Sequence, residues 1–361
     1  MGIASQLCTC VSVGVALLAV LIGLFAAGVP SQLGLFTWIA SAVPALVGMS
    51  PAFAEGAQFD FTRLGALDLA GQRAVVTGAN SGLGFATSLH LARQGAKVVL
   101  ACRTPSKCDA AAAAIRHNTT GADVQTLTLD TSDLDSVRSF AALLLDRGDA
   151  VDMLYLNAGI AGATVRGEAN VLNKHGVEMV FATNVVGHHL LYKLTLPLLE
   201  QAPRARVVLT ASAANFVTYS YGVATDLPTL NSGDSGLLYG QSKFAQVVWA
   251  REATRRLGVD SSVAVNSCHP GAVDTGIWDQ LEFLLGPRLG PPARSATQLL
   301  QDALMWSAEE GALTQLFLGA AEHDSRGLYY HPQAVQVEPN PLTKDLQLGI
   351  RMWDFLDQLV Q

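Results

Sequence analysis

A tyrosine and a lysine at helical spacing are the strongest candidates for chemistry in this sequence. Tyr239 and Lys243 would share one face of a predicted helix, Tyr239–Leu257. A phenol, with an unperturbed pKa of about 10, is a weak acid–base group at neutral pH, but a neighbouring ammonium stabilises the phenolate and lowers that pKa. Tyr239 could therefore exchange a proton with a substrate oxygen. This spacing is common by chance, so its position in the fold has to support it.

Two other polar residues could complete such a site. Ser212 follows a predicted strand, Ala205–Thr210, and its hydroxyl could donate to a substrate carbonyl oxygen or serve only in a turn. Asn184 lies within an otherwise apolar predicted helix, Gly176–Glu200, where asparagine is unfavourable. It could hold a water molecule in a proton relay, or simply bond to the backbone.

A glycine-rich turn follows the first predicted strand and leads directly into a helix. It reads Thr77-Gly78-Ala79-Asn80-Ser81-Gly82-Leu83-Gly84. Glycine allows close approach of the backbone, and the amide groups at a helix start favour a pyrophosphate. A plain strand-to-helix turn is the alternative. We predict a dinucleotide site here, formed by Gly78, Asn80, Ser81, Gly82, Leu83 and Gly84.

The end of the second predicted strand distinguishes NADP(H) from NAD(H). An acidic residue there would bind the ribose 2′-hydroxyl and repel a 2′-phosphate, whereas this chain has uncharged Cys102 followed by Arg103. The pattern favours NADP(H), with a solvated surface charge as the alternative role of Arg103.

Two later strand ends also lead toward the expected cofactor. Asp130 ends the third strand and could accept a hydrogen bond from the adenine amino group, or cap a helix. Asn157, Ala158 and Gly159 close the fourth strand with small residues beside the cofactor, or form an ordinary turn.

The elements that must position these residues alternate short strands with longer helices. The predicted strands are Arg73–Thr77, Lys97–Ala101, Val124–Leu129, Asp152–Leu156, Ala205–Thr210 and Ser262–Ser267. The predicted helices are Gly82–Gln94, Pro105–His117, Leu134–Arg147, Gly176–Glu200 and Tyr239–Leu257. Ser220–Gly236 is predicted as a loop, and Phe283–Pro292 as a loop or lid.

The strands lack polar alternation, which indicates burial on both faces of a parallel sheet. We therefore predict an α/β fold, a Rossmann-type doubly wound parallel sheet that forms a single domain over residues 56–361.

The first 54 residues contain no Asp, Glu, Lys or Arg. Residues 1–55 are therefore predicted to be an apolar membrane anchor or a targeting segment. Val11–Val29 is long enough for a membrane-spanning helix, and Leu33–Met49 could be a second span, a re-entrant segment or an interfacial helix. Ala52-Phe53-Ala54 resembles a cleavage site, which leaves removal after targeting as the alternative. Arg63 and Arg73 follow the apolar region, which favours a cytoplasmic catalytic domain.

Charge and cysteine content exclude other classes of partner. The chain has 361 residues and a net charge of −7, without a basic block, so nothing favours nucleic acid as a partner. Its five cysteines lack zinc-ligand spacing, and no metal site is predicted. Cys102, Cys108 and Cys268 are expected to be reduced thiols in a cytosol-facing enzyme.

Taken in order, these motifs resemble the classical short-chain dehydrogenases/reductases, in particular the retinol dehydrogenase-like and WW-domain oxidoreductase-like branch. The resemblance covers about Asp68 to Leu359. It rests on Thr77–Gly84, Ala101–Arg103, Asn157–Gly159, Thr183–His188, Tyr239–Lys243 and His269–Thr275.

The resemblance implies a catalytic tetrad of Asn184, Ser212, Tyr239 and Lys243. Tyr239 would exchange the proton, and Lys243 would lower its pKa and bind the nicotinamide ribose. Ser212 would orient the carbonyl group, and Asn184 would hold the relay water.

By the same resemblance, Asp130 would contact the adenine. The nicotinamide carboxamide and the pyrophosphate region would be held by Pro270, Gly271, Val273 and Thr275. The sequence departs from many members of the family at Leu156, where a second asparagine is frequent, and at Ala211, where a serine is frequent. No tryptophan–tryptophan interaction module precedes the predicted domain. The resemblance to WW-domain oxidoreductases therefore concerns only their oxidoreductase part.

The segment after Thr275 is largely apolar and would line a substrate pocket or pack on the core. We expect an NADPH-preferring enzyme that interconverts a lipophilic alcohol and its aldehyde or ketone, of the retinoid, steroid or long-chain carbonyl class. The expected location is the endoplasmic reticulum membrane, with a plastid as the alternative. A light-dependent protochlorophyllide-type reductase and a catalytically silent NADP(H)-binding interaction protein are the alternative functions. No oligomeric state is predicted.

Overall fold

The computed structural model describes residues 56–163, 169–273 and 305–361. Within these ranges, eight strands form one sheet in the order β3-β2-β1-β4-β5-β6-β7-β8. All neighbouring strands are parallel except β7 and β8, which are antiparallel. The strands are β1 (Arg73–Thr77), β2 (Lys97–Cys102), β3 (Val124–Thr128), β4 (Met153–Leu156), β5 (Ala205–Thr210), β6 (Val263–Cys268), β7 (Tyr329–His331) and β8 (Val335–Gln336).

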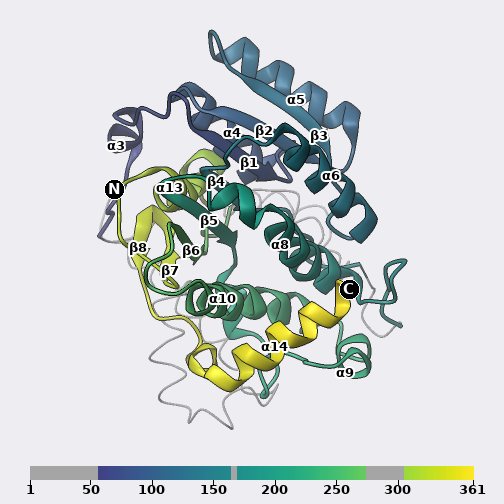
Figure 1. Ribbon diagram of the computed structural model, residues 1–361. Coiled ribbons are helices and arrows are strands. Elements are labelled where there is room, and N and C mark those ends of the chain that lie inside the picture. Colours follow the sequence, from purple (N-terminus) through teal and green to yellow (C-terminus); the bar gives the residue numbers. More distant parts are fainter. Residues whose placement is uncertain (1–55, 164–168, 274–304) are drawn as a thin grey trace, which may run out of the picture.

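Helices cover both faces of this sheet (Figure 1). The helices α4 (Gly82–Arg93), α5 (Pro105–Asn118) and α13 (Ala308–Ala320) cover one face, and the opposite face is covered by α6 (Leu134–Arg147), α8 (Gly187–Leu199) and α10 (Leu238–Leu257). The final helix, α14 (Leu346–Leu359), packs against α10. Short helices are α3 (Phe61–Gly65), α7 (Met179–Phe181) and α9 (Leu227–Asn231). Single 3₁₀ turns occupy Ala213–Phe216, Pro332–Ala334 and Pro341–Lys344.

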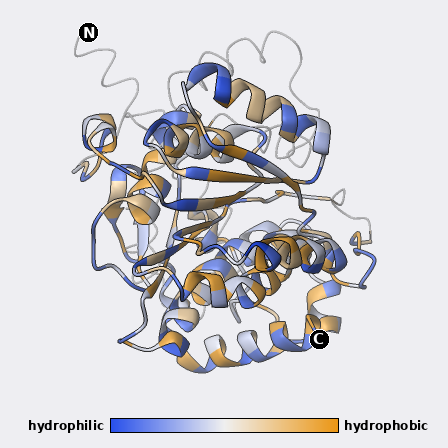
Figure 2. Ribbon diagram, turned by 45° about the horizontal axis from the view of Figure 1, so that its top comes forward, coloured by the Kyte–Doolittle hydropathy of each residue, from blue (hydrophilic) through white to orange (hydrophobic). Residues whose placement is uncertain are grey.

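Two hydrophobic cores lie on the two faces of the sheet. Val75 belongs to the core beneath α6, α8 and α10, whereas its neighbours Ala74 and Val76 belong to the core beneath α4, α5 and α13. Side chains alternate between the faces of a strand, and both faces here are covered, so β1 is apolar throughout. Figure 2 shows the contrast with α14, in which hydrophobic and hydrophilic residues alternate because only one side packs inward.

The predicted Rossmann-type α/β sheet is confirmed, and the strand predictions are confirmed to within one residue at each end. Arg73–Thr77, Ala205–Thr210 and Leu134–Arg147 have the predicted bounds. The sheet order has its topological switch between β1 and β4, where the connections diverge to opposite sides.

One predicted helix is wrong as a continuous element. The range Gly176–Glu200 contains α7, a π-helical turn over Ala182–Val186, and then α8. Glu178 begins the helical part, because its carboxylate accepts hydrogen bonds from the amides of Val180 and Phe181. The predicted loop Ser220–Gly236 also differs, since it contains α9 with Asp226 as its N-cap.

The expectation of three reduced thiols is also wrong in part. Cys102 and Cys108 form a disulfide, and Cys268 is a free, buried thiol. Cys102 ends β2 and Cys108 lies in the first turn of α5, so the short connection brings their Cα atoms to 5.7 Å. That separation is within the range of a disulfide, which residue spacing along the sequence could not reveal.

No helix in residues 56–163, 169–273 or 305–361 combines the length and hydrophobicity needed to cross a bilayer. The predicted membrane segments Val11–Val29 and Leu33–Met49, the apolar segment after Thr275 and the predicted lid Phe283–Pro292 all lie outside the described residues.

Candidate active site

The candidate site lies at the carboxyl edge of the sheet, where β1 and β4 end side by side. Thr77, the last residue of β1, is fully buried, and its hydroxyl oxygen accepts hydrogen bonds from the amides of Asn157 and Ala158, each at 2.9 Å. This fixes the residues after β4 against the turn after β1. Sequence reasoning treated Thr77 only as part of the glycine motif and missed this role.

Close backbone packing explains two of the predicted glycines. Gly78 has a φ of +66°, and a Cβ there would lie 3.0 Å from the Cα of Ala158. A Cβ on Gly84 would lie 2.4 Å from the carbonyl oxygen of Gly78. Any side chain at Gly84 would therefore push α4 away from the turn.

The start of α4 fits a pyrophosphate. Gly82 and Leu83 form its first turn, and Ser81 is the N-cap, but the Ser81 side chain makes no capping hydrogen bond. Asn80 instead donates from its side chain to the Ser81 hydroxyl at 3.3 Å. The amides of this first turn are thus left for an anionic group, which the positive end of the helix dipole also favours.

Arg103 and Asp130 lie at the ends of neighbouring strands. Arg103 directly follows β2 and is exposed, as expected of a side chain available to a phosphate. One carboxylate oxygen of Asp130 accepts from the amide and hydroxyl of Ser132, at 2.9 and 2.7 Å. Asp133, not Asp130, caps α6, so the capping alternative for Asp130 is excluded.

Asn157 binds within the protein through both ends of its side-chain amide. Its Nδ2 donates to the carbonyl oxygen of Thr77 at 2.9 Å, and its Oδ1 accepts from Gln315 at 3.2 Å and from Thr210 at 3.4 Å. The side chain predicted to contact the cofactor therefore holds three elements together. Ala158 and Gly159 leave the space beside it unfilled by long side chains.

Three members of the predicted tetrad converge at the carboxyl end of β5. Ser212 follows that strand, and its hydroxyl oxygen accepts a hydrogen bond from the amide of Ala214 at 3.1 Å. The Ser212 side chain is also hydrogen-bonded to Tyr239. The Lys243 ammonium is buried and donates to the carbonyl oxygen of Thr210 at 2.7 Å. It lies 5.5 Å from the centre of the Tyr239 ring. The helix α10 thus places both Tyr239 and Lys243 beside the end of β5, as the i, i+4 spacing predicts.

In the absence of a cofactor, burial is the largest influence on the pKa values of Tyr239 and Lys243. Burial raises the pKa of Tyr239 to about 12, although the hydrogen bond with Ser212 opposes the rise. Burial also lowers the pKa of Lys243 to about 7, with Cys268 acting weakly in the other direction. The pKa of Tyr239 is thus raised and not lowered, because desolvation of the phenolate outweighs the hydrogen bond with Ser212.

Asn184 reaches the tetrad from the π-helical turn. Its side-chain oxygen accepts from the amide of Ile160 at 2.9 Å, and its Nδ2 donates to the Ile160 carbonyl at 3.0 Å and to Ser242 at 2.9 Å. A Cβ placed on Gly159 would lie 3.2 Å from the Asn184 oxygen and 3.6 Å from the Lys243 nitrogen. Both atoms therefore border the same small space beside Gly159.

Ser242 is a site residue that sequence reasoning missed. Besides accepting from Asn184, its hydroxyl donates to the carbonyl oxygen of Tyr239 at 2.7 Å. It thus links the π-helical turn to the helix that carries the tyrosine. The sequence feature that could have indicated this role is the position of Ser242 between Tyr239 and Lys243.

The predicted nicotinamide-binding segment is described in part. Pro270 and Val273 are buried after β6, and Gly271 has a φ of +93°. A Cβ on Gly271 would lie 2.2 Å from the Trp306 ring, so only glycine fits there. Thr275 lies outside the described residues.

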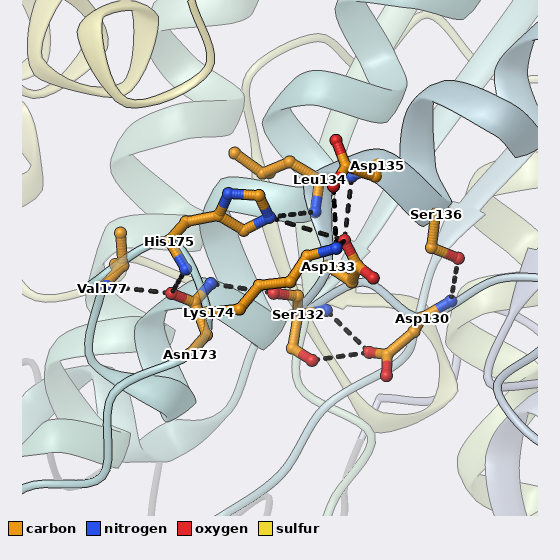
Figure 3. Close-up of polar contacts among 10 residues, drawn as sticks. All are labelled: Asp130, Ser132, Asp133, Leu134, Asp135, Ser136, Asn173, Lys174, His175 and Val177. Carbon is orange, nitrogen blue, oxygen red and sulfur yellow. Dashed lines mark hydrogen bonds and ion pairs between the residues drawn. The ribbon is translucent and has the colours of Figure 1, made fainter.

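A cluster of ionisable side chains is joined to Asp130 through Ser132 and Asn173 (Figure 3). The Lys174 ammonium lies 2.7 Å from Asp133 and 2.8 Å from Asp135, and His175 accepts from the amide of Leu134. Asp133, Asp135 and His175 are close enough to hold a metal ion, but the Lys174 ammonium already forms ion pairs with both carboxylates.

The fold and site define a Rossmann-type α/β protein with a dinucleotide turn and a Ser, Tyr and Lys cluster at its carboxyl edge. Residues 72–282 match the short chain dehydrogenase family. The chain belongs to the short-chain dehydrogenase/reductase family of oxidoreductases, and within it is retinol dehydrogenase-like.

Relatives and solved structures agree with this assignment. A short-chain dehydrogenase/reductase of Armillaria gallica is 35% identical, over 80% of this chain and 90% of that protein. Human retinol dehydrogenase 13 is 33% identical, over 78% of this chain and 82% of that protein. A solved protein from Mycobacterium paratuberculosis is 29% identical with a TM-score of 0.60, over 82% of this chain and 96% of that chain.

The buried Lys243 gives a pH-dependent prediction for stability. Folding lowers the pKa of Lys243 from 10.5 to about 7, so below pH 7 the folded protein must bury an ammonium. Between pH 7 and pH 10.5 the unfolded chain binds more protons than the folded protein. The free energy of unfolding should therefore be higher for Lys243→Met than for the parent at pH 6, by about 5 kcal/mol. The difference should shrink as the pH rises from 7 toward 10.

Chemical denaturation of the cofactor-free protein at several pH values measures this difference. Lys97→Met, which removes an exposed lysine, is the control and should show a difference that does not change with pH. A Lys243→Met difference that stays constant from pH 6 to pH 10 would contradict the buried-ammonium account.

Proposed function

We propose that this protein is an NADP(H)-dependent oxidoreductase that interconverts a lipophilic alcohol and its aldehyde or ketone, with reduction as the cellular direction. The observation that carries the proposal is the convergence of Tyr239, Ser212 and Lys243 beside the glycine turn. The two alternatives from the sequence, a protochlorophyllide-type reductase and a silent binding protein, gain no support from the relatives named above.

The cofactor would be held along the edge from α4 to β6. The uncapped start of α4 would bind the pyrophosphate, Asp130 the adenine and Lys243 the nicotinamide ribose, with the backbone around Gly271 beside the carboxamide. Glycine at position 84 lets α4 pack closely on the turn, and glycine at position 159 leaves free the small space that Asn184 and Lys243 border. When bound, NADPH supplies a hydride to the carbonyl carbon.

The side chains of the chain supply the proton. Ser212 would donate to the carbonyl oxygen and hold it beside Tyr239, whose phenol then transfers its proton to that oxygen. A phenol whose pKa is raised by burial stays protonated at neutral pH, so it is available as the acid of the reduction. Asn184 and Lys243 border one space beside Gly159, where a water molecule could return the proton from solvent.

Preference for NADPH is supported by the charge at the end of β2. Arg103 is exposed at that point and Cys102 carries no negative charge, because it is bonded to Cys108. A planar guanidinium can bind a phosphate through two parallel hydrogen bonds. The ribose 2′-phosphate of NADP(H) is the group that would take this position.

A lipophilic substrate is supported by the apolar residues after Thr275 and by the likeness to retinol dehydrogenases. We further propose that residues 1–55 place the domain, residues 56–361, at a membrane, with the endoplasmic reticulum favoured. The charge-free composition of that segment carries this part of the proposal.

Replacement of Tyr239 by Phe should remove the proton donor without removing the cofactor site. We expect turnover with an aliphatic aldehyde to fall by about a hundredfold or more, since acid–base groups contribute rate factors of that order. NADPH affinity should change by less than about threefold, as measured by NADPH fluorescence. Tyr192→Phe, in α8 and packed against Trp249, is the control. Unchanged turnover with intact NADPH binding would refute the assigned acid.

Replacement of Arg103 by Ala should weaken NADPH selectively. We expect its KM for NADPH to rise by about tenfold or more, because a charge-assisted pair with a phosphate is lost, while the KM for NADH stays unchanged. Arg93→Ala, in the last turn of α4, is the matched control. Equal losses with both cofactors would show that Arg103 does not read the 2′-phosphate.

Removal of residues 1–55 should abolish membrane association without abolishing catalysis. The protein that begins at Gly56 should keep NADPH-dependent turnover within about twofold, because every proposed site residue follows it, but should no longer sediment with membranes. Membrane flotation and activity assays on the two chains measure this. Persistent membrane binding, or loss of NADPH binding, would contradict the division at residue 55.

A further inference from the structure

Two side chains converge on the backbone carbonyl of Asn184. His188 lies 3.0 Å away through its Nδ1, and Gln246 donates through its Nε2, also at 3.0 Å. All three residues are buried, with exposures of 0–1%. The pocket that Asn184, His188 and Gln246 line has no room for a water molecule, so water in that pocket cannot replace either contact.

The protonation of His188 follows from this contact. A carbonyl oxygen can only accept, so Nδ1 must carry the hydrogen and donate it. Burial also lowers the pKa of His188 to about 4, so the ring is neutral at physiological pH and Nε2 is an acceptor. The Thr77 hydroxyl lies 3.0 Å from Nε2 and supplies the donor.

Thr77 is also the residue that fixes the cofactor edge. Its hydroxyl oxygen accepts from Asn157 and Ala158. Its single hydrogen is shared between Nε2 of His188, at 3.0 Å, and the carbonyl oxygen of Tyr155, at 3.2 Å. The imidazole therefore has the glycine turn bonded to one nitrogen and the π-helical turn of the tetrad bonded to the other.

We infer that His188 is a positioning residue that couples the cofactor turn to the catalytic tetrad through its two ring nitrogens. The Nε2 side holds Thr77, and with it the turn that binds NADPH. The Nδ1 side holds the Asn184 backbone, and with it the side chain beside Lys243. This inference deepens the proposed function and rests on it.

The neighbouring histidine shows what a purely structural histidine does in this helix. His189 is equally buried, but its Nε2 faces Asp357 of α14 at 2.9 Å and its Nδ1 accepts from Trp249 at 3.0 Å. These contacts join α8 to α10 and α14 and reach neither Thr77 nor Asn184. His189 is therefore a matched control, with the same residue type, helix and burial.

Two substitutions can separate the two nitrogens of His188. An asparagine amide takes the place of Nδ1 and can still donate to Asn184, whereas it is too short to reach Thr77. A glutamine amide takes the place of Nε2 and can still accept from Thr77, but leaves the Asn184 carbonyl without this donor. His188→Leu removes both contacts at similar volume.

The test measures NADPH affinity by fluorescence, kcat with an aliphatic aldehyde and thermal stability for all three variants. We expect His188→Asn to raise the NADPH Kd about tenfold with kcat within about threefold of the parent, and His188→Gln to lower kcat about tenfold with Kd nearly unchanged. His188→Leu should show both losses. His189→Asn and His189→Gln should lower the melting temperature without changing Kd or kcat per folded molecule.

Equal kinetic effects of His188→Asn and His188→Gln, or effects on stability alone, would overturn the inference. A parent protein that binds NADPH but reduces no carbonyl compound would instead refute the proposed function. In that case the Kd values still decide the contact with Thr77, since raised values for His188→Asn and His188→Leu but not His188→Gln support it, and equal values for all three reject it.

Discussion

The hydrogen bonds of the Thr77 hydroxyl are the contacts on which the rest of the site depends. They join the last residue of β1 to the amides that follow β4, at the point where the sheet connections diverge. Parallel strands offer a ligand crevice at such a point because their connecting loops leave in opposite directions. The glycine turn belongs to one strand and Gly159, beside Lys243, to the other. The Thr77 hydroxyl therefore helps to fix the glycine turn relative to the residues beside the tetrad.

The chemistry-bearing groups are costly to bury, and the network around them offsets part of that cost. Lys243 donates to a backbone carbonyl, and both ends of the Asn184 amide are bonded to the protein. The lowered pKa of Lys243 and the raised pKa of Tyr239 show that desolvation still dominates. An anionic cofactor would favour the charged form of the lysine, so binding and charge state should be coupled.

Periodicity and burial patterns predicted most of the fold, because β1 and β5 are apolar throughout and α6 has a clear apolar face. The π-helical turn at Ala182–Val186 was not predicted, because such turns are rare and apolar periodicity does not distinguish them from an α-helix; within it, His188 and Gln246 contact the Asn184 carbonyl. The Cys102–Cys108 pair depends likewise on how a strand meets a helix. For the site, the motif order located Ser212, Tyr239 and Lys243, but the bonding role of Asn157 required the fold.

The central claim is that one continuous edge, from Arg103 past α4 to Tyr239, forms a single NADP(H) site. A crystal structure of the protein grown with saturating NADPH tests this most directly. The account predicts the 2′-phosphate within hydrogen-bond distance of Arg103, the pyrophosphate at the start of α4 and the nicotinamide ring beside Tyr239 and Lys243. Electron density that places the nicotinamide away from Tyr239, or the 2′-phosphate away from Arg103, would contradict it.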